Sequence, residues 1–262
     1  LRNSYDQRFI LGMEYSYIFN EQQQGKHSYN YFRGDMNIAG NVIQAVSSIA
    51  GASKNEDGQY ELFGNHFAQF AKMQLEYRNY RVLNGNSQFV SRFIAGIGVP
   101  YGNSDVLPYV KQFFIGGTNS LRGWTVRTLG PGSDTTNAES IYLDQTGDVK
   151  LESNFEYRFD MISRMKGAFF VDVGNIWALK DDPNREGEEF VFNRFASELA
   201  VDAGLGLRLD FTYFIFRFDL GVPLKDPSRP EGDRWLFNEI DFGNRDWRRD
   251  NLLLNLAIGY PF

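Results

Sequence analysis

The chain has 262 residues, of which 42% are hydrophobic and 23% charged, and its net charge is −6. No run of about 18 apolar residues occurs, which excludes a membrane-spanning helix, and no basic patch suggests a nucleic-acid partner. The absence of cysteine excludes disulfides and thiolate metal sites. The 16% of aromatic residues and the 26 glycines are typical of many strands joined by turns, with aromatic girdles at their ends.

Alternation of apolar and polar side chains predicts strands along the chain. In the segment 67–78, Met73 and Leu75 alternate with Gln74 and Glu76. The segments are long enough to match the about 9–11 residues that a tilted strand needs to cross a bilayer. The first four strands are expected at 8–19, 28–40, 67–78 and 88–99.

The clearest alternation covers residues 148–160. One side carries Leu151 and Phe155, and the other side carries Glu152 and Glu156. We expect the apolar side to face lipid and the polar side to face a lumen. The remaining strands are expected at 167–177, 198–209, 212–222 and 252–262, which gives about nine strands in total.

The links between these strands alternate in length. Bacterial outer-membrane barrels have short periplasmic turns and long extracellular loops, so the alternation predicts an all-β, antiparallel transmembrane barrel. Such barrels normally have an even number of strands, so we expect further strands before Leu1. The short links are expected at 20–26, 83–87, 161–166 and 210–211, and the long ones at 41–66, 100–146, 178–197 and 223–250.

The longest predicted loop carries Gly116-Gly117 followed by Leu121-Arg122-Gly123-Trp124. This run resembles the loop motif Val/Leu-Arg-Gly-Phe of the BamA/TamA superfamily of outer-membrane assembly factors (the bacterial surface antigen family), with Trp124 in place of the usual Phe. Two stretches in the same order, 147–159 and 170–174, resemble the next two strands of that family.

The resemblance implies that residues 1–262 are the last nine of sixteen barrel strands, with the loop 100–146 folded into the lumen. It also implies that POTRA domains and the first strands precede this chain. In that family the loop arginine bonds acidic residues of the barrel wall.

Glu156 and Asp172 suit that role, because both have the lumen-facing parity and the short link 161–166 joins their strands. A guanidinium can form charge-assisted bonds to two such carboxylates, which would otherwise repel one another. We therefore predict a lock between Arg122, Glu156 and Asp172. The alternative is three unrelated lumen charges.

The last predicted strand resembles the recognition strand of proteins that this family handles. Asn255, Tyr260 and Phe262 stand at its polar, hydrophobic and aromatic positions, although Ala257 replaces a usual Gly. The apolar side of this strand is expected to include Tyr260 and Phe262. Pro261 cannot donate to a ladder, which predicts a weakly paired strand end. An ordinary lipid-facing last strand is the alternative.

Catalysis and metal binding find little support. The two histidines, His27 and His66, lie near predicted strand ends, so we expect no enzyme, no catalytic residue and no cofactor. The acidic run 186–189 and Asp144 are interpreted as solvated surface and not as a Ca²⁺ site.

The basic run 245–249, which contains Arg245, Arg248 and Arg249 beside Trp247, is interpreted as an ordinary charged loop. Contact with lipopolysaccharide phosphates is the alternative interpretation of this run.

The resemblance implies a bacterial outer-membrane factor that inserts or exports proteins through a weak lateral seam, without covalent chemistry. Its implied partners are outer-membrane lipids and lipopolysaccharide, client outer-membrane or secreted proteins, and accessory lipoproteins or an inner-membrane partner. A two-partner secretion pore of the same superfamily and a passive porin are the alternatives. The stretch 107–114 favours the TamA-like branch over the BamA-like one.

Overall fold

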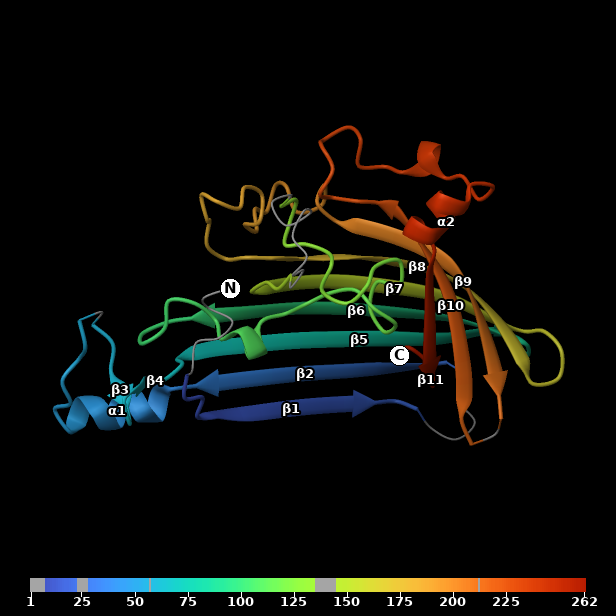
Figure 1. The fold of residues 1–262 in the computed structure, drawn as a ribbon. Helices are drawn as coiled ribbons and strands as arrows, with labels where there is room; N and C mark the ends of the chain where they lie inside the picture. The colour runs from blue at the N-terminus through green and yellow to red at the C-terminus, as the bar shows by residue number, and fades with distance from the viewer. Residues whose placement is uncertain (1–7, 23–27, 57, 135–144, 212) are drawn as a thin grey trace.

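The computed structural model describes residues 8–22, 28–56, 58–134, 145–211 and 213–262. His27, Asp144 and parts of the predicted links 20–26 and 100–146 lie outside these residues. Within the described part, nine strands form one antiparallel sheet in which each strand pairs with its neighbours in the chain (Figure 1). In order they are β1 (Gly12–Asn20), β2 (Tyr29–Ala39), β5 (Phe70–Asn84), β6 (Ser87–Pro100), β7 (Val149–Asp160), β8 (Met165–Trp177), β9 (Ala200–Asp210), β10 (Ile215–Lys225) and β11 (Leu253–Ile258).

The all-β, antiparallel fold class is thereby confirmed, and β1 and β11 are the two edges of the sheet. Three of the connections are short, at 85–86, 161–164 and 211–214, as the alternation in link length predicts. A strand parity that holds from β1 to β11 follows from the register of the eight strand pairs, because partner residues lie on the same face.

The long links contain small elements that the sequence analysis treats as loop. Apolar residues with helical spacing do not alternate with a period of two, so that pattern gives no sign of a helix. No helix in the described residues is long and apolar enough to cross a membrane. The small elements are α1 (Asn41–Ile49), the hairpin β3 (Glu61–Leu62) and β4 (Asn65–His66), η2 (Tyr109–Lys111), η3 (Phe237–Glu239) and α2 (Arg245–Asn251).

The two faces of the sheet differ as the alternation predicts. The sheet curves, and the described part of the 101–148 link lies on its concave side (Figure 1). On this side Glu152 and Glu156 of β7 are buried. On the other side, aromatic rings of neighbouring strands pack in a row: Phe93 meets Phe155 at 5.6 Å and Phe159 meets Phe169 at 5.4 Å between ring centroids. The concave side is therefore polar and the convex side is apolar and aromatic.

The prediction for the end of the chain is wrong in one respect. The strand β11 ends at Ile258, and Tyr260 and Phe262 do not continue along its apolar side. Gly259 turns the chain with a φ of 91°, a conformation that glycine adopts without steric cost. Phe262 is then only 8% exposed and packs with Tyr80 and Val90 on the concave side. We call residues 259–262 the C-terminal tail.

The assignment of the faces can be tested on three consecutive residues of β5. Spin labels at Met73 and Leu75 should be accessible to oxygen dissolved in the bilayer, because both side chains are exposed on the convex side. A label at Gln74 should be accessible to a water-soluble nickel reagent. Equal accessibility at all three positions would contradict a wall with one lipid-facing side.

Candidate functional site

The tip of the long loop is built around a pair of glycines. Gly116 and Gly117 both have a φ of 93°, which disfavours residues with a side chain. A Cβ at Gly116 would lie 2.4 Å from the carbonyl oxygen of Thr125. The tight turn lets the Gly117 N–H donate to the Trp124 carbonyl over 2.8 Å. The loop then rests on a hydrophobic cluster of Phe113, Ile115, Leu121, Leu129, Ile176 and Ala200, with Trp124 packed against it.

Arg122 lies at the centre of the site, with its side chain fully buried. Its Nε and Nη2 atoms donate to the two carboxylate oxygens of Asp172, at 2.9 and 3.0 Å. Its Nη1 donates to Glu156 over 2.6 Å, and Asp219 lies 3.5 Å from the same nitrogen. The guanidinium also lies 3.5 Å from the centroid of the Phe170 ring. The structure therefore brings together Arg122, Glu156 and Asp172.

Register explains why two acids from two strands reach one guanidinium. Asn154 is the partner of Asp172 in the β7–β8 hairpin, and Glu156 is the partner of Phe170. The carboxylates of Glu156 and Asp172 thus lie on the same face of the sheet, at neighbouring diagonal positions of the two strands. Burial alone would lower the pKa of Arg122, but Asp172 and Glu156 outweigh burial and raise that pKa, so the guanidinium stays charged.

The same region contains acids and arginines that the sequence analysis did not single out. Arg208 donates to Asp219 over 2.7 Å and to Glu156 over 3.0 Å, and Arg158 donates to Glu156 over 2.7 Å. The Gly123 N–H donates to Asp202 over 2.9 Å. The wall residues Asp202, Asp219, Arg158 and Arg208 all have the lumen-facing parity of their strands, which is the one signal in the sequence that could have found them.

Space for the loop backbone is provided by glycines. A Cβ at Gly123 would meet the Cβ of Asp202 at 2.5 Å, and one at Gly221 would meet the carbonyl oxygen of Arg122 at 2.4 Å. The loop backbone is therefore in direct contact with the backbone of β10 and with the Asp202 side chain of β9. Larger residues at either position would push the arginine away from its acids.

Strands on both sides of the β7–β8 hairpin hold the residues that precede Arg122. Arg92 of β6 donates to the Asn119 carbonyl over 2.7 Å, and Arg217 of β10 donates to the Thr118 carbonyl over 2.7 Å. The Ser120 hydroxyl donates to Glu152 over 2.6 Å. The loop tip 118–123 is thus bonded to five strands from β6 to β10.

The predicted C-terminal residues also reach this site. The Asn255 side chain donates to the carbonyl oxygen of Arg122 over 2.8 Å, which ties β11 to the loop. In the C-terminal tail, the Tyr260 ring lies 4.4 Å from the guanidinium of Arg158, and the Phe262 ring lies 4.8 Å from that of Arg92. Both arginines also bond wall acids of the loop site.

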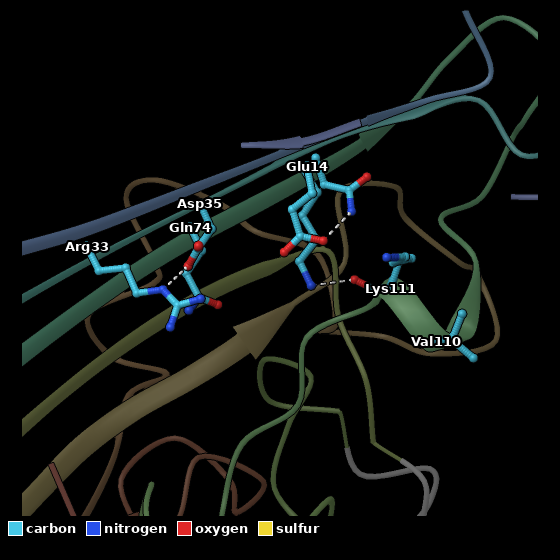
Figure 2. A pocket seen from close by; sticks show the side chains of 8 residues that line it. Glu14, Arg33, Asp35, Gln74, Val110 and Lys111 are labelled. Atoms are coloured by element: carbon cyan, nitrogen blue, oxygen red, sulfur yellow. Dashed lines mark hydrogen bonds and ion pairs between the residues drawn. The ribbon is translucent and has the colours of Figure 1, made fainter. Parts of the chain in front are cut away.

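A polar cavity of about 250 Å³ lies farther along the concave face (Figure 2). Two of its charged side chains have partners within the molecule. Arg33 donates to the carboxylate of Asp35 over 2.7 Å, and Lys72 donates to the backbone carbonyl of Lys111 over 2.7 Å. Lys72 also lies 4.0 Å from the centroid of the Phe113 ring. Lys72, which lines this cavity, therefore attaches the loop to β5 at a further point, in η2.

The remaining candidates lie apart from this site. His66 is 3.9 Å from Glu61 in the small hairpin. In the acidic run, Glu188 pairs with Arg185 at 2.9 Å, and burial raises the pKa of Glu188 to about 7.

The basic run forms α2. There Arg249 pairs with Asp246 at 3.1 Å and Arg248 donates to backbone carbonyls, among them that of Gly243 at 3.0 Å. These bonds give Arg248 and Arg249 partners within their own loop.

Three comparisons relate the chain to known proteins. The Omp85 superfamily domain matches residues 4–239. The outer membrane protein assembly factor BamA of Nitratidesulfovibrio vulgaris is 29% identical over 157 residues, which is 60% of this chain and 18% of that protein. The crystal structure of BamA from Haemophilus ducreyi lacking POTRA domains 1–3 aligns with a TM-score of 0.58 and 14% identity, over 96% of this chain and 42% of that one. The chain thus spans less than half the length of either relative.

Replacing Arg122 with Ala should destabilise the site strongly. The change leaves Glu156 and Asp172 buried without their cation, and breaking a buried ion pair in this way costs about 3–5 kcal/mol. We expect proteolysis of the loop in the folded variant and a lower temperature of unfolding on semi-native gels. Arg229→Ala, which removes an exposed pair with Glu239, is the matched control and should change neither reading. A protease-resistant Arg122→Ala loop would rule out the lock.

Replacing Asn255 with Ala should loosen β11 from the loop. The lost bond to the Arg122 carbonyl leaves a buried acceptor without this donor, at a cost of about 1–3 kcal/mol. Backbone amides of β11 should exchange with deuterium faster, while those of β7 should not change. Exchange that is unchanged in β11 would mean that the bond does not hold the strand.

Proposed function

The chain belongs to the Omp85 superfamily, and from this premise we propose that it is the C-terminal portion of a barrel that assembles or translocates client proteins. Its antiparallel sheet and its relatives make it a protein of the bacterial outer membrane. In this proposal, further strands pair with the free edges of β1 and β11 to close the barrel, POTRA domains precede it, and the loop lies in its lumen.

The buried Arg122 is the observation that carries the proposal. A passive pore has no need of a loop bonded to six strands, β6 to β11, around one charged centre. The bonds of Arg122 to Glu156 and Asp172 keep the hairpin β7–β8 in one arrangement. The strands β6 to β10 held in this way cannot part easily, so opening of the wall is left to the edge of β11 that pairs with no described strand.

The edge strand β11 is suited to such movement. It has only 6 residues, whereas its neighbour β10 has 11. Fewer ladder hydrogen bonds are then available to a strand on its other side, and Pro261 in the tail cannot donate one. We place the lateral seam between β11 and the strand that pairs with it in the closed barrel.

Client outer-membrane or secreted proteins would reach this seam, and accessory lipoproteins or an inner-membrane partner would assist. Lipids and lipopolysaccharide surround the wall. The mechanism needs no covalent step, since a weak seam lowers the barrier to strand insertion. Assignment to the TamA-like branch stays a prediction.

A disulfide across the seam tests the proposal in the full-length protein. It joins a cysteine in β11 to one in the pairing strand, and it should block assembly of client barrels in cells until the disulfide is reduced. A disulfide between Phe218 and Leu256, which are register partners in β10 and β11, is the matched control and should leave assembly intact.

Two results would contradict the proposal. Full assembly of clients with the seam closed would exclude lateral opening. Export of a soluble substrate through the closed barrel would favour a two-partner secretion pore, which conducts through its lumen and does not need the wall to part.

A further inference from the structure

The link between β2 and β5 carries an apolar surface that the described residues leave uncovered. In α1, the residues Val42, Val46 and Ile49 follow the spacing of one helix face and are all exposed, Ile49 to 88%. A helix normally turns such a stripe towards a protein core. Here the buried residue of the helix is Ile43, which lies outside the stripe.

The start of α1 is fixed to the end of the sheet. The side-chain oxygen of Asn41 accepts hydrogen bonds from Gln69 over 3.0 Å and from Tyr101 over 2.9 Å. At Gly40 the φ of 83° turns the chain from β2 into the helix, and a Cβ there would lie 2.5 Å from the Ala68 carbonyl. The helix is therefore held beyond the end of β2 (Figure 1). The side chains of its stripe are exposed.

The charge pattern of this segment is unusual for a solvated loop. Between Asp35 and Lys54 the sequence contains no charged residue. The side of α1 next to the stripe carries the uncharged polar residues Asn41, Gln44 and Ser48. A helix of this composition can enter the boundary of a bilayer by burying apolar area alone, because no charge has to be taken out of water.

A second part of the same link continues this surface onto the wall. Phe63, at the turn between β3 and β4, is 86% exposed and has a φ of 52°, which is uncommon for a bulky residue. Its ring lies 6.3 Å from that of Phe9. Phe9 is followed by the exposed side chains of Leu11 and Met13, and Met13 lies on the convex, lipid-facing side of the β1–β2 pair. The apolar surface thus runs from the lipid-facing wall into the link.

We propose that the exposed stripe of α1, together with Phe63, inserts into the outer leaflet of the membrane. The occupant of this surface is the upper part of the lipid acyl chains. The link joins β2 to β5 at the end of the sheet that carries the long links, which is the extracellular end in barrels of this kind. Because the helix is uncharged, its insertion does not depend on salt or on anionic headgroups.

The proposal can be tested with a fluorescent probe at two neighbouring positions of α1. The full-length protein is labelled with an environment-sensitive dye at a cysteine replacing Ile49 or Ser48, and folded into phosphatidylcholine vesicles. The dye at position 49 should be quenched several-fold more by lipids with a nitroxide near the top of the acyl chain than by aqueous iodide. The dye at position 48 should show the reverse order. Phosphatidylglycerol or high salt should change neither result.

Two results would overturn the proposal. Equal quenching by iodide at both positions would show that the stripe faces water. Protection of position 49 from both quenchers would show that protein covers it.

A charge on the stripe gives an independent test in the same vesicles. Val46→Asp should expose the dye at position 49 to iodide, because a carboxylate opposes burial in lipid. A charge on the polar side is the control, and Ser48→Asp should leave the dye at position 49 in lipid. Heat resistance on semi-native gels checks that the barrel is folded in each variant. A Val46→Asp protein whose dye stays in lipid would contradict the proposal.

Discussion

The buried guanidinium of Arg122 is the constraint on which the rest of the site depends. A charge removed from water is tolerated only when ionic partners and hydrogen bonds replace its hydration. Asp172 and Glu156 do so directly, and Asp219 lies close by. Any arrangement that separates the loop from the wall leaves several like charges facing one another. The loop and the wall are therefore stable together and unstable apart.

Features outside the ion pairs follow from this requirement. Three strands have to bring acids to one point, which requires one register through the hairpin β7–β8 and on to β10. The loop backbone has to lie against the wall, and Gly123 and Gly221 leave the space for it. The wall acids need further cations, and Arg158 and Arg208 provide them. The result is a polar, tightly bonded interior beneath an apolar outer surface.

The site is also connected to the edge of the sheet. Asn255 bonds the Arg122 carbonyl, while Arg158 contacts both Glu156 and the Tyr260 ring. A displacement of β11 or of the C-terminal tail would therefore change contacts of the loop site. This connection supplies a physical route by which the state of the edge strand and the state of the loop can influence one another.

The strands and their parity could be predicted from the sequence, because period-two alternation and link length are local signals. The central arginine was predicted from the resemblance of its loop to a family motif. The roles of Asp202, Asp219 and Arg208 could not, since they depend on register across three strands. The stripe of α1 was missed because its spacing is helical inside a predicted loop. The inward turn of Phe262 depends on the positive φ of Gly259 and on contacts with distant strands, neither of which the sequence specifies.

A double-mutant cycle between Arg122→Ala and Asp172→Asn tests the central claim most directly. The free energy of unfolding in urea would be measured for the four proteins in lipid vesicles. If the two side chains stabilise the fold as one unit, their effects should be non-additive, with a coupling of about 0.5–3 kcal/mol. Additive effects, as expected for Arg122→Ala combined with the remote Arg229→Ala, would show that the loop is held by something other than this charged centre.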